Sequence, residues 1–121
     1  ICERPEAVLS DIAACTAERR GIPIVYLYEA NNPANLGAVI RTAEAAGSAA
    51  VLLSPGSADP FSPKALRGSM GSGFRMPVVR SVSTEDLFAF AAASQLAIAA
   101  AAAVGATDHY DFEWARGWVL C

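Results

Sequence analysis

Short apolar runs alternate with segments of helical periodicity along the chain, and this alternation constrains the fold more than any other feature. Residues 22–28 (IPIVYLY) form a nearly continuous run of β-branched, aromatic and other apolar side chains. Such a run is typical of a strand that is buried on both faces of a sheet. Further strands are expected at residues 49–53, 76–82 and 96–103, and from residue 118 onward.

Helices are expected between these strands, at residues 6–20, 36–46, 64–69 and 84–94. Ser62 before Pro63 is a helix-start signal, because the hydroxyl can cap the helix and proline suits its first position. Ser83 followed by Asp86 has the spacing of a capping box. The alternation predicts an α/β fold with a parallel sheet and helices on both faces.

Composition limits the class of protein. A chain of 121 residues has the size of one domain. Hydrophobic residues make up 54%, and although 26 residues are alanine, enough larger apolar side chains remain for one core, which excludes a disordered chain. Cys2, Cys15 and Cys121 share no C-x-x-C spacing and His109 is the only histidine, so we expect neither a disulfide framework nor a metal site.

The basic residues are concentrated in the middle of an acidic chain. The formal net charge is −3, yet residues 35–80 carry five basic residues against Glu44 and Asp59. The five are Arg41, Lys64, Arg67, Arg75 and Arg80. A local positive field of this kind can attract an anionic ligand even when the total charge is negative.

Residues 31–41 (NNPANLGAVIR) follow the first expected strand, where α/β proteins place their ligands. We expect Asn35 at the start of a helix and Arg41 nearly two turns later. Gly37 leaves room for another backbone or a ligand to approach the first turn closely. Taken alone, the segment also fits an asparagine-capped helix with an arginine on its surface.

Residues 60–77 combine cationic side chains with glycines. Lys64, Arg67 and Arg75 lie near three glycines, whose accessible backbone N–H groups suit phosphate or ribose oxygens. The segment has neither the P-loop spacing nor a dinucleotide-binding glycine pattern after a strand. Taken alone, it also fits a flexible loop with solvated cations.

Together the two segments resemble the first two motifs of the SpoU/TrmH family of SPOUT-class RNA ribose 2′-O-methyltransferases. Residues 32–47 (NPANLGAVIRTAEAAG) are similar to the family pattern N-P-x-N-x-G-x-x-x-R-T-A-x-x-x-G. Residues 62–71 (SPKALRGSMG) with 75–78 (RMPV) are similar to the second motif, in the same order and at the same separation. The resemblance extends over nearly the whole chain.

The resemblance implies transfer of a methyl group from S-adenosyl-L-methionine to a ribose 2′-hydroxyl of transfer or ribosomal RNA. It places Asn35 and Arg41 on the family's catalytic residues. It further implies a trefoil-knotted sheet and a homodimer with the active site at the interface. Four residues are expected to face the RNA: Lys64, Arg67, Ser69 and Arg75.

Arg41 is expected to act by its charge. Because a guanidinium seldom loses its proton, we expect Arg41 to hold a phosphate and to stabilise the developing alkoxide rather than to serve as the base. Asn35 would orient Arg41 or the ribose by hydrogen bonding. A phosphate oxygen or a water molecule could then accept the proton.

The family's third motif, a G-x-E-x-x-G loop followed by an N-S-x-x-x-A helix, is not found in the chain. In the family this motif supplies most of the cofactor pocket. The remaining expected cofactor contacts are the backbone groups of Ala101, Ala102 and Ala103. We expect residues 22–121 to form the catalytic domain, incomplete before the third motif, and residues 1–21 to be a helix or linker from a preceding RNA-binding region.

Two other functions stay open at this point. The chain could be a non-catalytic RNA-binding or dimerisation module with the same fold, or an unrelated doubly wound nucleotide-binding domain. The second requires a phosphate-binding loop after the first strand, where residues 31–35 supply little but proline and asparagine. No secretory signal or membrane span is apparent, so we expect a cytoplasmic protein.

We predict that the 121-residue chain by itself binds S-adenosyl-L-methionine poorly and lacks activity, because it does not contain the third motif. Isothermal titration of the cofactor into the chain measures this directly. Micromolar binding to residues 1–121 would contradict the prediction.

Overall fold

A five-stranded parallel sheet lies at the centre of the protein in the computed structural model, which describes residues 7–18, 21–105, 107–112, 114 and 117–121. The strand order is β3-β2-β1-β5-β4, and every neighbouring pair is parallel. The strands are β1 (Ile24–Leu27), β2 (Val51–Leu53), β3 (Val78–Val79), β4 (Ala97–Ala99) and β5 (Trp118–Leu120). The predicted parallel α/β fold is confirmed.

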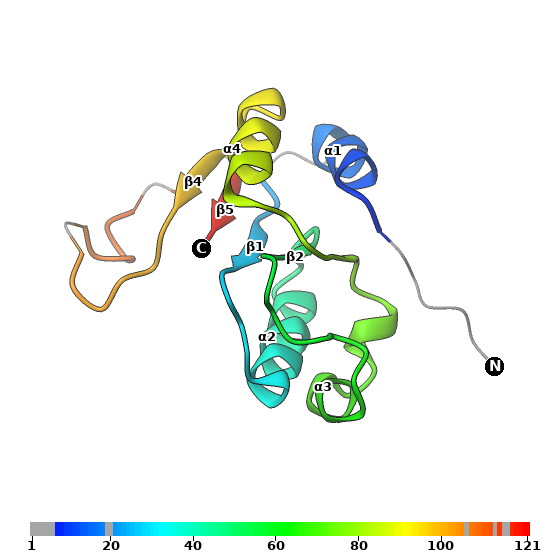
Figure 1. The fold of residues 1–121 in the computed structure, drawn as a ribbon. Helices are drawn as coiled ribbons and strands as arrows, with labels where there is room; N and C mark the ends of the chain where they lie inside the picture. The colour runs from blue at the N-terminus through cyan, green and yellow to red at the C-terminus, as the bar shows by residue number, and fades with distance from the viewer. Residues whose placement is uncertain (1–6, 19–20, 106, 113, 115–116) are drawn as a thin grey trace.

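Helices cover both faces of this sheet (Figure 1). They are α1 (Leu9–Glu18), α2 (Pro33–Ala45), α3 (Pro63–Ser69) and α4 (Thr84–Ala93), with a short 3₁₀ helix η1 (Ser72–Phe74). Helices α1 and α4 lie on one side of the sheet, and α2 lies on the other with α3 beside it. Parallel strands need such crossover connections, and placing them on both faces buries β2 and β3, while β4 stays half-buried.

Alternate residues of each central strand pack on opposite faces. Ile24 and Tyr26 of β1 belong to the cluster that includes residues of α1 and α4, whereas Val25 and Leu27 pack on the cluster that includes residues of α2. Successive side chains of a strand point to opposite sides, so an apolar run without alternation must be covered twice. The run at residues 22–28 therefore has the environment that its composition predicts.

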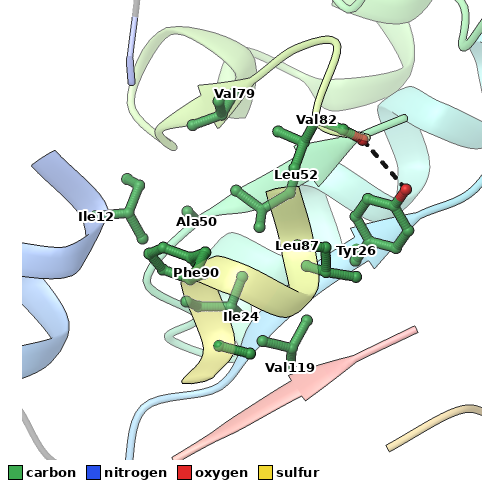
Figure 2. Close-up of a cluster of buried hydrophobic side chains, with 11 residues drawn as sticks. Ile12, Ile24, Tyr26, Ala50, Leu52, Val79, Val82, Leu87, Phe90 and Val119 are labelled. Carbon is green, nitrogen blue, oxygen red and sulfur yellow. Dashed lines mark hydrogen bonds between the residues drawn. The ribbon is translucent and has the colours of Figure 1, made fainter. Parts of the chain in front are cut away.

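The cluster under α1 and α4 contains the core's buried tyrosine (Figure 2). Ile12 of α1 and Phe90 of α4 are 3% and 8% exposed and enclose the sheet from this side. The Tyr26 hydroxyl donates a hydrogen bond to the Val82 carbonyl oxygen at 3.2 Å. This bond satisfies a buried polar group and joins β1 to the segment that leads into α4. One such hydrogen bond contributes about 1 kcal/mol to the stability of the fold.

Helices α2 and α3 touch through their backbones. A Cβ atom on Gly37 would overlap the carbonyl oxygen of Ala65 and would lie 2.9 Å from the amide nitrogen of Ser69. Across the contact, a Cβ atom on Gly68 would lie 3.0 Å from the Ala34 carbonyl oxygen. The absence of both side chains lets the two helices meet at this distance. The close approach expected at Gly37 is made by another backbone.

Several elements differ in extent from their predicted ranges. β3 has only two residues, because Ser81 turns the chain out of the sheet with a φ of 58°. β4 ends at Ala99, and residues 100–104 form an exposed loop, since alanine has little preference for a strand. Helix α1 spans Leu9–Glu18, while Glu6, Arg19 and Arg20 of its predicted range lie outside the described residues. Ile12 places this helix in the core, and the origin of residues 1–21 in a preceding region stays a prediction.

Replacing Gly37 with alanine should lower the free energy of unfolding by about 1–3 kcal/mol or more, because the added methyl group meets backbone atoms that cannot rotate away. Urea denaturation followed by circular dichroism measures the loss. Gly105→Ala is the control, since its new Cβ would come no closer than 3.8 Å to its nearest neighbour. Equal stability of the two variants would contradict the helix contact.

Candidate active site

The first motif begins where β1 ends. Asn32 caps α2, and its side-chain oxygen accepts hydrogen bonds from the backbone N–H of Ala34 at 2.9 Å and of Asn35 at 3.4 Å. Pro33 occupies the first helical turn, so α2 starts three residues before the predicted residue 36. An Asn-Pro pair is a helix-start signal of the same kind as Ser62-Pro63. Asn35 therefore lies inside the first turn, with an exposed side chain.

The loop that leads into α2 is held by the chain that follows β2. The Glu29 amide donates to the Ser54 hydroxyl oxygen at 2.7 Å, and the Ala30 amide donates to the Ser57 hydroxyl oxygen at 3.3 Å. The Ala58 amide in turn donates to the Ala30 carbonyl oxygen at 3.0 Å. These bonds fix the direction in which the chain enters α2, and thereby the position of Asn35.

Arg41 is exposed on α2 and contacts the second motif. Its Nη1 group donates to the thioether sulfur of Met70 at 3.2 Å. Met70 follows α3 directly, is 71% exposed, and has a left-handed backbone with a φ of 50°. No hydrogen bond joins Asn35 to Arg41 in the part of the chain that the structure describes. The expectation that Asn35 orients Arg41 is therefore not supported, and orientation of the ribose is the role that stays open for it.

Helix α3 presents two further cations. Ser62 caps this helix as predicted, and its hydroxyl oxygen accepts a hydrogen bond from the Ala65 amide at 3.4 Å. Lys64 and Arg67 are exposed, and no ion pair joins either of them to another described residue. The contact between α2 and α3 thus brings the exposed cations of both motifs onto adjoining helices.

Ser69 has a structural position. Its side chain is completely buried, its hydroxyl donates to the Leu66 carbonyl oxygen at 3.1 Å, and it accepts the Gly73 amide at 3.4 Å. The expected contact of Ser69 with RNA does not fit this environment. A small polar residue is required here because the α2–α3 contact leaves little space and the Gly73 amide needs an acceptor.

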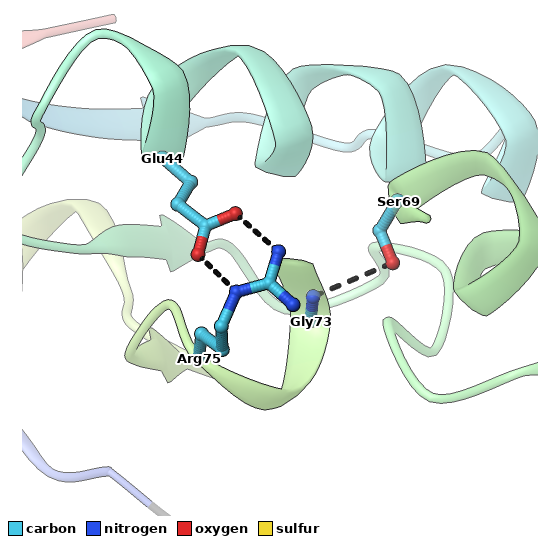
Figure 3. Close-up of polar contacts among 4 residues, drawn as sticks. All are labelled: Glu44, Ser69, Gly73 and Arg75. Carbon is cyan, nitrogen blue, oxygen red and sulfur yellow. Dashed lines mark hydrogen bonds and ion pairs between the residues drawn. The ribbon is translucent and has the colours of Figure 1, made fainter. Parts of the chain in front are cut away.

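Arg75 forms an ion pair within the chain (Figure 3). Its Nε and Nη2 groups donate to the two carboxylate oxygens of Glu44 at 2.6 and 2.8 Å. Hydrogen bonds from Arg75 and then Ser72 lower the pKa of Glu44 from 4.5 to about 2, and Glu44 raises the pKa of Arg75. The pair joins α2 to the segment after η1, so part of the charge expected to face RNA is neutralised by Glu44.

A hollow lies at the carboxyl ends of β4 and β5. It has a volume of ≈ 970 Å³ and is lined by residues 98–105 and by Thr107, Asp108, His109, Phe112, Trp114 and Leu120. Ala101, Ala102 and Ala103 are exposed in its wall, which is the position expected for cofactor contacts. The Phe112 ring packs against those of Trp114 and Trp118 with centroids 4.6 Å apart in each case.

Four contributions to this region were not predicted from the sequence. Ser54 and Ser57 hold the loop before α2, Met70 contacts Arg41, and Glu44 binds Arg75. Each joins residues far apart in the chain, so no local pattern reveals it. The alternation of the two motifs with strands signals only that their loops share one edge of the sheet.

Comparison with known proteins decides the family. The model of the SpoU rRNA Methylase family matches residues 23–121. The chain belongs to this family. The resemblance drawn from the two motifs is thereby confirmed, and the unrelated nucleotide-binding domain is excluded.

Two bacterial methyltransferases are similar to a large part of the chain. The chain is 42% identical over 80 residues to the 23S rRNA (guanosine(2553)-2′-O)-methyltransferase RlmP of Bacillus subtilis, a match covering 66% of this chain and 29% of the relative. It is 31% identical over 94 residues to a 23S rRNA (uridine(2479)-2′-O)-methyltransferase of Streptomyces viridochromogenes, covering 74% of this chain and 33% of the relative. The chain thus spans about a third or less of these proteins.

The fold is also shared with solved structures. An AdoMet-bound rRNA methyltransferase from Sinorhizobium meliloti superimposes with a TM-score of 0.86 at 33% identity, covering 98% of this chain and 44% of that one. The SpoU methyltransferase AviRb from Streptomyces viridochromogenes superimposes with a TM-score of 0.78 at 27% identity, covering 84% of this chain and 42% of that one. The SPOUT-type fold is therefore confirmed, while the trefoil knot stays a prediction.

The described ranges offer neither a metal site nor a membrane-spanning helix. No group of three or more His, Cys, Asp or Glu residues there could hold a metal ion. None of the helices in those ranges is long and apolar enough to cross a membrane.

The Glu44–Arg75 pair predicts a titration in acid. Because the pKa of Glu44 is lowered in the folded chain, the pair stabilises the fold above pH 4.5, and this contribution is lost as the pH falls toward about 2. Carboxyl ¹³C NMR should follow the Glu44 titration. Arg75→Gln should return the Glu44 pKa toward 4.5, while Arg67→Gln should leave it near 2. An unchanged Glu44 titration in Arg75→Gln would contradict the pairing.

Proposed function

We propose that this chain forms part of an S-adenosyl-L-methionine-dependent methyltransferase that methylates a ribose 2′-hydroxyl of ribosomal RNA. Its family membership and the names of its relatives support the reaction and the type of RNA. The observation that carries the proposal is the position of Arg41, which is exposed beside the end of α3 and adjoins a helix with two further exposed cations.

Lys64 and Arg67 are the residues proposed to bind the RNA backbone. They are exposed on one short helix, and lysine and arginine provide the phosphate contacts that position nucleic acids. Arg75 contributes less to RNA binding in this proposal, because Glu44 already occupies two of its donor groups. Ser69 acts by shaping the turn between α3 and η1.

The hollow at β4 and β5 is the proposed position of part of the methyl-donor pocket, and the third motif would supply the rest. Its volume of ≈ 970 Å³ lies within the range of about 300–1,000 Å³ for small-molecule sites. Residues 101–103 offer backbone donors and acceptors, and the aromatic side chains of Phe112 and Trp114 offer apolar surface for a planar base. S-adenosyl-L-methionine supplies a methyl group on a positively charged sulfur, which makes the methyl carbon electrophilic.

Arg41 and Asn35 are proposed to act on the ribose. The 2′-oxygen attacks the methyl carbon, so a C–O bond forms as the C–S bond breaks, and the hydroxyl proton leaves to a phosphate oxygen or to water. The Arg41 guanidinium stays charged, holds a phosphate and stabilises negative charge that develops on the 2′-oxygen. Asn35, at the first turn of α2, orients the ribose by hydrogen bonding.

The homodimer and the cytoplasmic location belong to the same proposal. Met70 and Phe74 are 71% and 57% exposed and lie next to the proposed RNA-binding helix, where a second subunit could cover them. Light scattering of the full-length protein tests the assembly.

A non-catalytic module with the same fold is the competing function, and absence of the third motif from the complete gene would favour it.

Arg41→Ala in the full-length protein should reduce methyl transfer to RNA by about 10²–10³-fold, because a donor to the developing oxyanion is lost. Transfer of labelled methyl groups to ribosomal RNA measures the rate. Circular dichroism should show an unchanged fold, because Arg41 is exposed and its contact with Met70 is at the surface.

Arg41→Lys provides the matched comparison. It retains the charge but not the planar fork, so it should recover only part of the activity. Turnover by Arg41→Ala equal to that of the unmodified protein would remove Arg41 from the mechanism.

A further inference from the structure

A second, smaller hollow lies between the carboxyl ends of β2 and β3. Its volume is ≈ 150 Å³. None of the residues that line this hollow belongs to either sequence motif. Five of the lining residues carry hydrogen-bonding side chains: Ser54, Ser57, Asp59, Arg80 and Ser81.

The size of this hollow limits what it can hold. At about 30 Å³ for each water molecule, ≈ 150 Å³ is the space of about five waters. Sites for whole drug-sized molecules measure about 300–1,000 Å³. The hollow therefore suits a group no larger than the sugar phosphate of one nucleotide, and the cofactor is too large for it.

Its charged groups suit both parts of a sugar phosphate. Arg80 Nη1 lies 4.0 Å from Asp59 Oδ1, and the Arg80 side chain is 43% exposed, so the guanidinium retains donors that face solvent. Asp59 Oδ1 accepts the Phe61 amide at 3.0 Å, and a carboxylate has about four acceptor positions, so it can bind sugar hydroxyls beside its existing partners. Arginine is well matched to phosphate oxygens.

The backbone at Ser81 is held in a disfavoured conformation. Ser81 has a φ of 58°, in the left-handed region that residues with a Cβ atom rarely adopt, and it follows Arg80 directly. The next residue, Val82, is buried and its amide donates to the Leu53 carbonyl oxygen at 2.9 Å. The turn therefore fixes Arg80 and Ser81 at the rim of the hollow. Strain of this kind is concentrated at binding sites.

The wall of the hollow is bonded to the loop of the first motif. Ser54 and Ser57 accept the amides of Glu29 and Ala30, which lie two to three residues before the Asn32 cap of α2. Strand spacing of about 4.8 Å also puts the middle of the β2–β3 pair only about 7 Å from β1 along the sheet. An RNA strand with its target ribose at Asn35 and Arg41 would bring a neighbouring nucleotide to this hollow.

We propose that this hollow binds the ribose and phosphate of an RNA nucleotide next to the methylated one. Arg80 binds the phosphate, and Asp59 with the Ser57 and Ser81 hydroxyls binds the ribose hydroxyls. Because the 2′-hydroxyl is the group that separates RNA from DNA, the hollow selects RNA at a position where no chemistry takes place. The inference rests on the proposed function for the identity of the polymer, but the binding chemistry can be tested without it.

The test uses three probes on the 121-residue chain: ribose 5-phosphate, 2-deoxyribose 5-phosphate and inorganic phosphate. Amide NMR shifts should change at Gly56, Ser57, Arg80 and Ser81 with ribose 5-phosphate, with a Kd in the millimolar range. The other two probes should bind several-fold more weakly. Equal binding of all three probes, no binding of ribose 5-phosphate, or shifts confined to other residues would overturn the proposal.

Variants locate the site. Arg80→Gln should weaken ribose 5-phosphate binding by about tenfold, because a charge-assisted hydrogen bond is lost. Glu85→Gln, an exposed change on α4, should leave binding as it is. Unchanged binding in a folded Arg80→Gln chain would overturn the role of Arg80. The preference of the unmodified chain for ribose over deoxyribose keeps the test decisive if Arg80→Gln fails to fold.

Failure of this site and failure of the methyltransferase function give different results. Selective ribose 5-phosphate binding without methyl transfer by the full-length protein would keep the site and remove the function. Methyl transfer that is insensitive to a deoxynucleotide on either side of the target would keep the function and remove the site.

Discussion

The backbone contact between α2 and α3 is the constraint on which the rest of the candidate site depends. Gly37 and Gly68 face each other without side chains, and a Cβ atom on either would come within 3.0 Å or less of the opposite backbone. Gly37 belongs to the first sequence motif and Gly68 to the second. The contact between their backbones therefore joins the two motifs without a shared ligand. The burial of Ser69 and the position of Met70 beside Arg41 both follow from how close the helices lie.

The polar contacts around this junction change the distribution of charge. Arg41, Lys64, Arg67 and Arg75 all lie on adjoining elements, yet Arg75 is held by both oxygens of Glu44. Of these four cations, the ones that remain for an anionic ligand beside the helix contact are therefore Arg41 on α2 and Lys64 and Arg67 on α3. The ion pair also joins the turn after η1 to α2, because two charge-assisted hydrogen bonds fix the orientation of the Arg75 side chain.

Local signals predicted the elements, and long-range contacts decided the site. Ser62 and Ser83 cap their helices as their spacing predicts, because a cap is made within four residues. The strand at residues 96–103 was predicted too long, since an alanine run has no periodicity that marks where pairing stops.

Ser69 and Arg75 were expected to face RNA because the family resemblance places them in the second motif. Their actual partners, Gly73 and Glu44, are set by packing of α2 against the second motif, and no pattern in residues 60–77 contains that information.

The order of the strands gives a physical reason for two separate binding regions on one edge. From β1 the chain adds β2 and β3 on one side, and it then crosses over to place β4 and β5 on the other side of β1. The loops at the carboxyl edge therefore lead away from β1 in opposite directions. The hollow of ≈ 970 Å³ lies on the β4–β5 side and the hollow of ≈ 150 Å³ on the β2–β3 side. The first motif starts from β1 between them, so in the proposed reaction the ribose is presented between a region for the methyl donor and a region for the neighbouring nucleotide. That arrangement requires the loop before α2 to stay in place when either side is filled, which is what the hydrogen bonds from Glu29 and Ala30 to Ser54 and Ser57 accomplish.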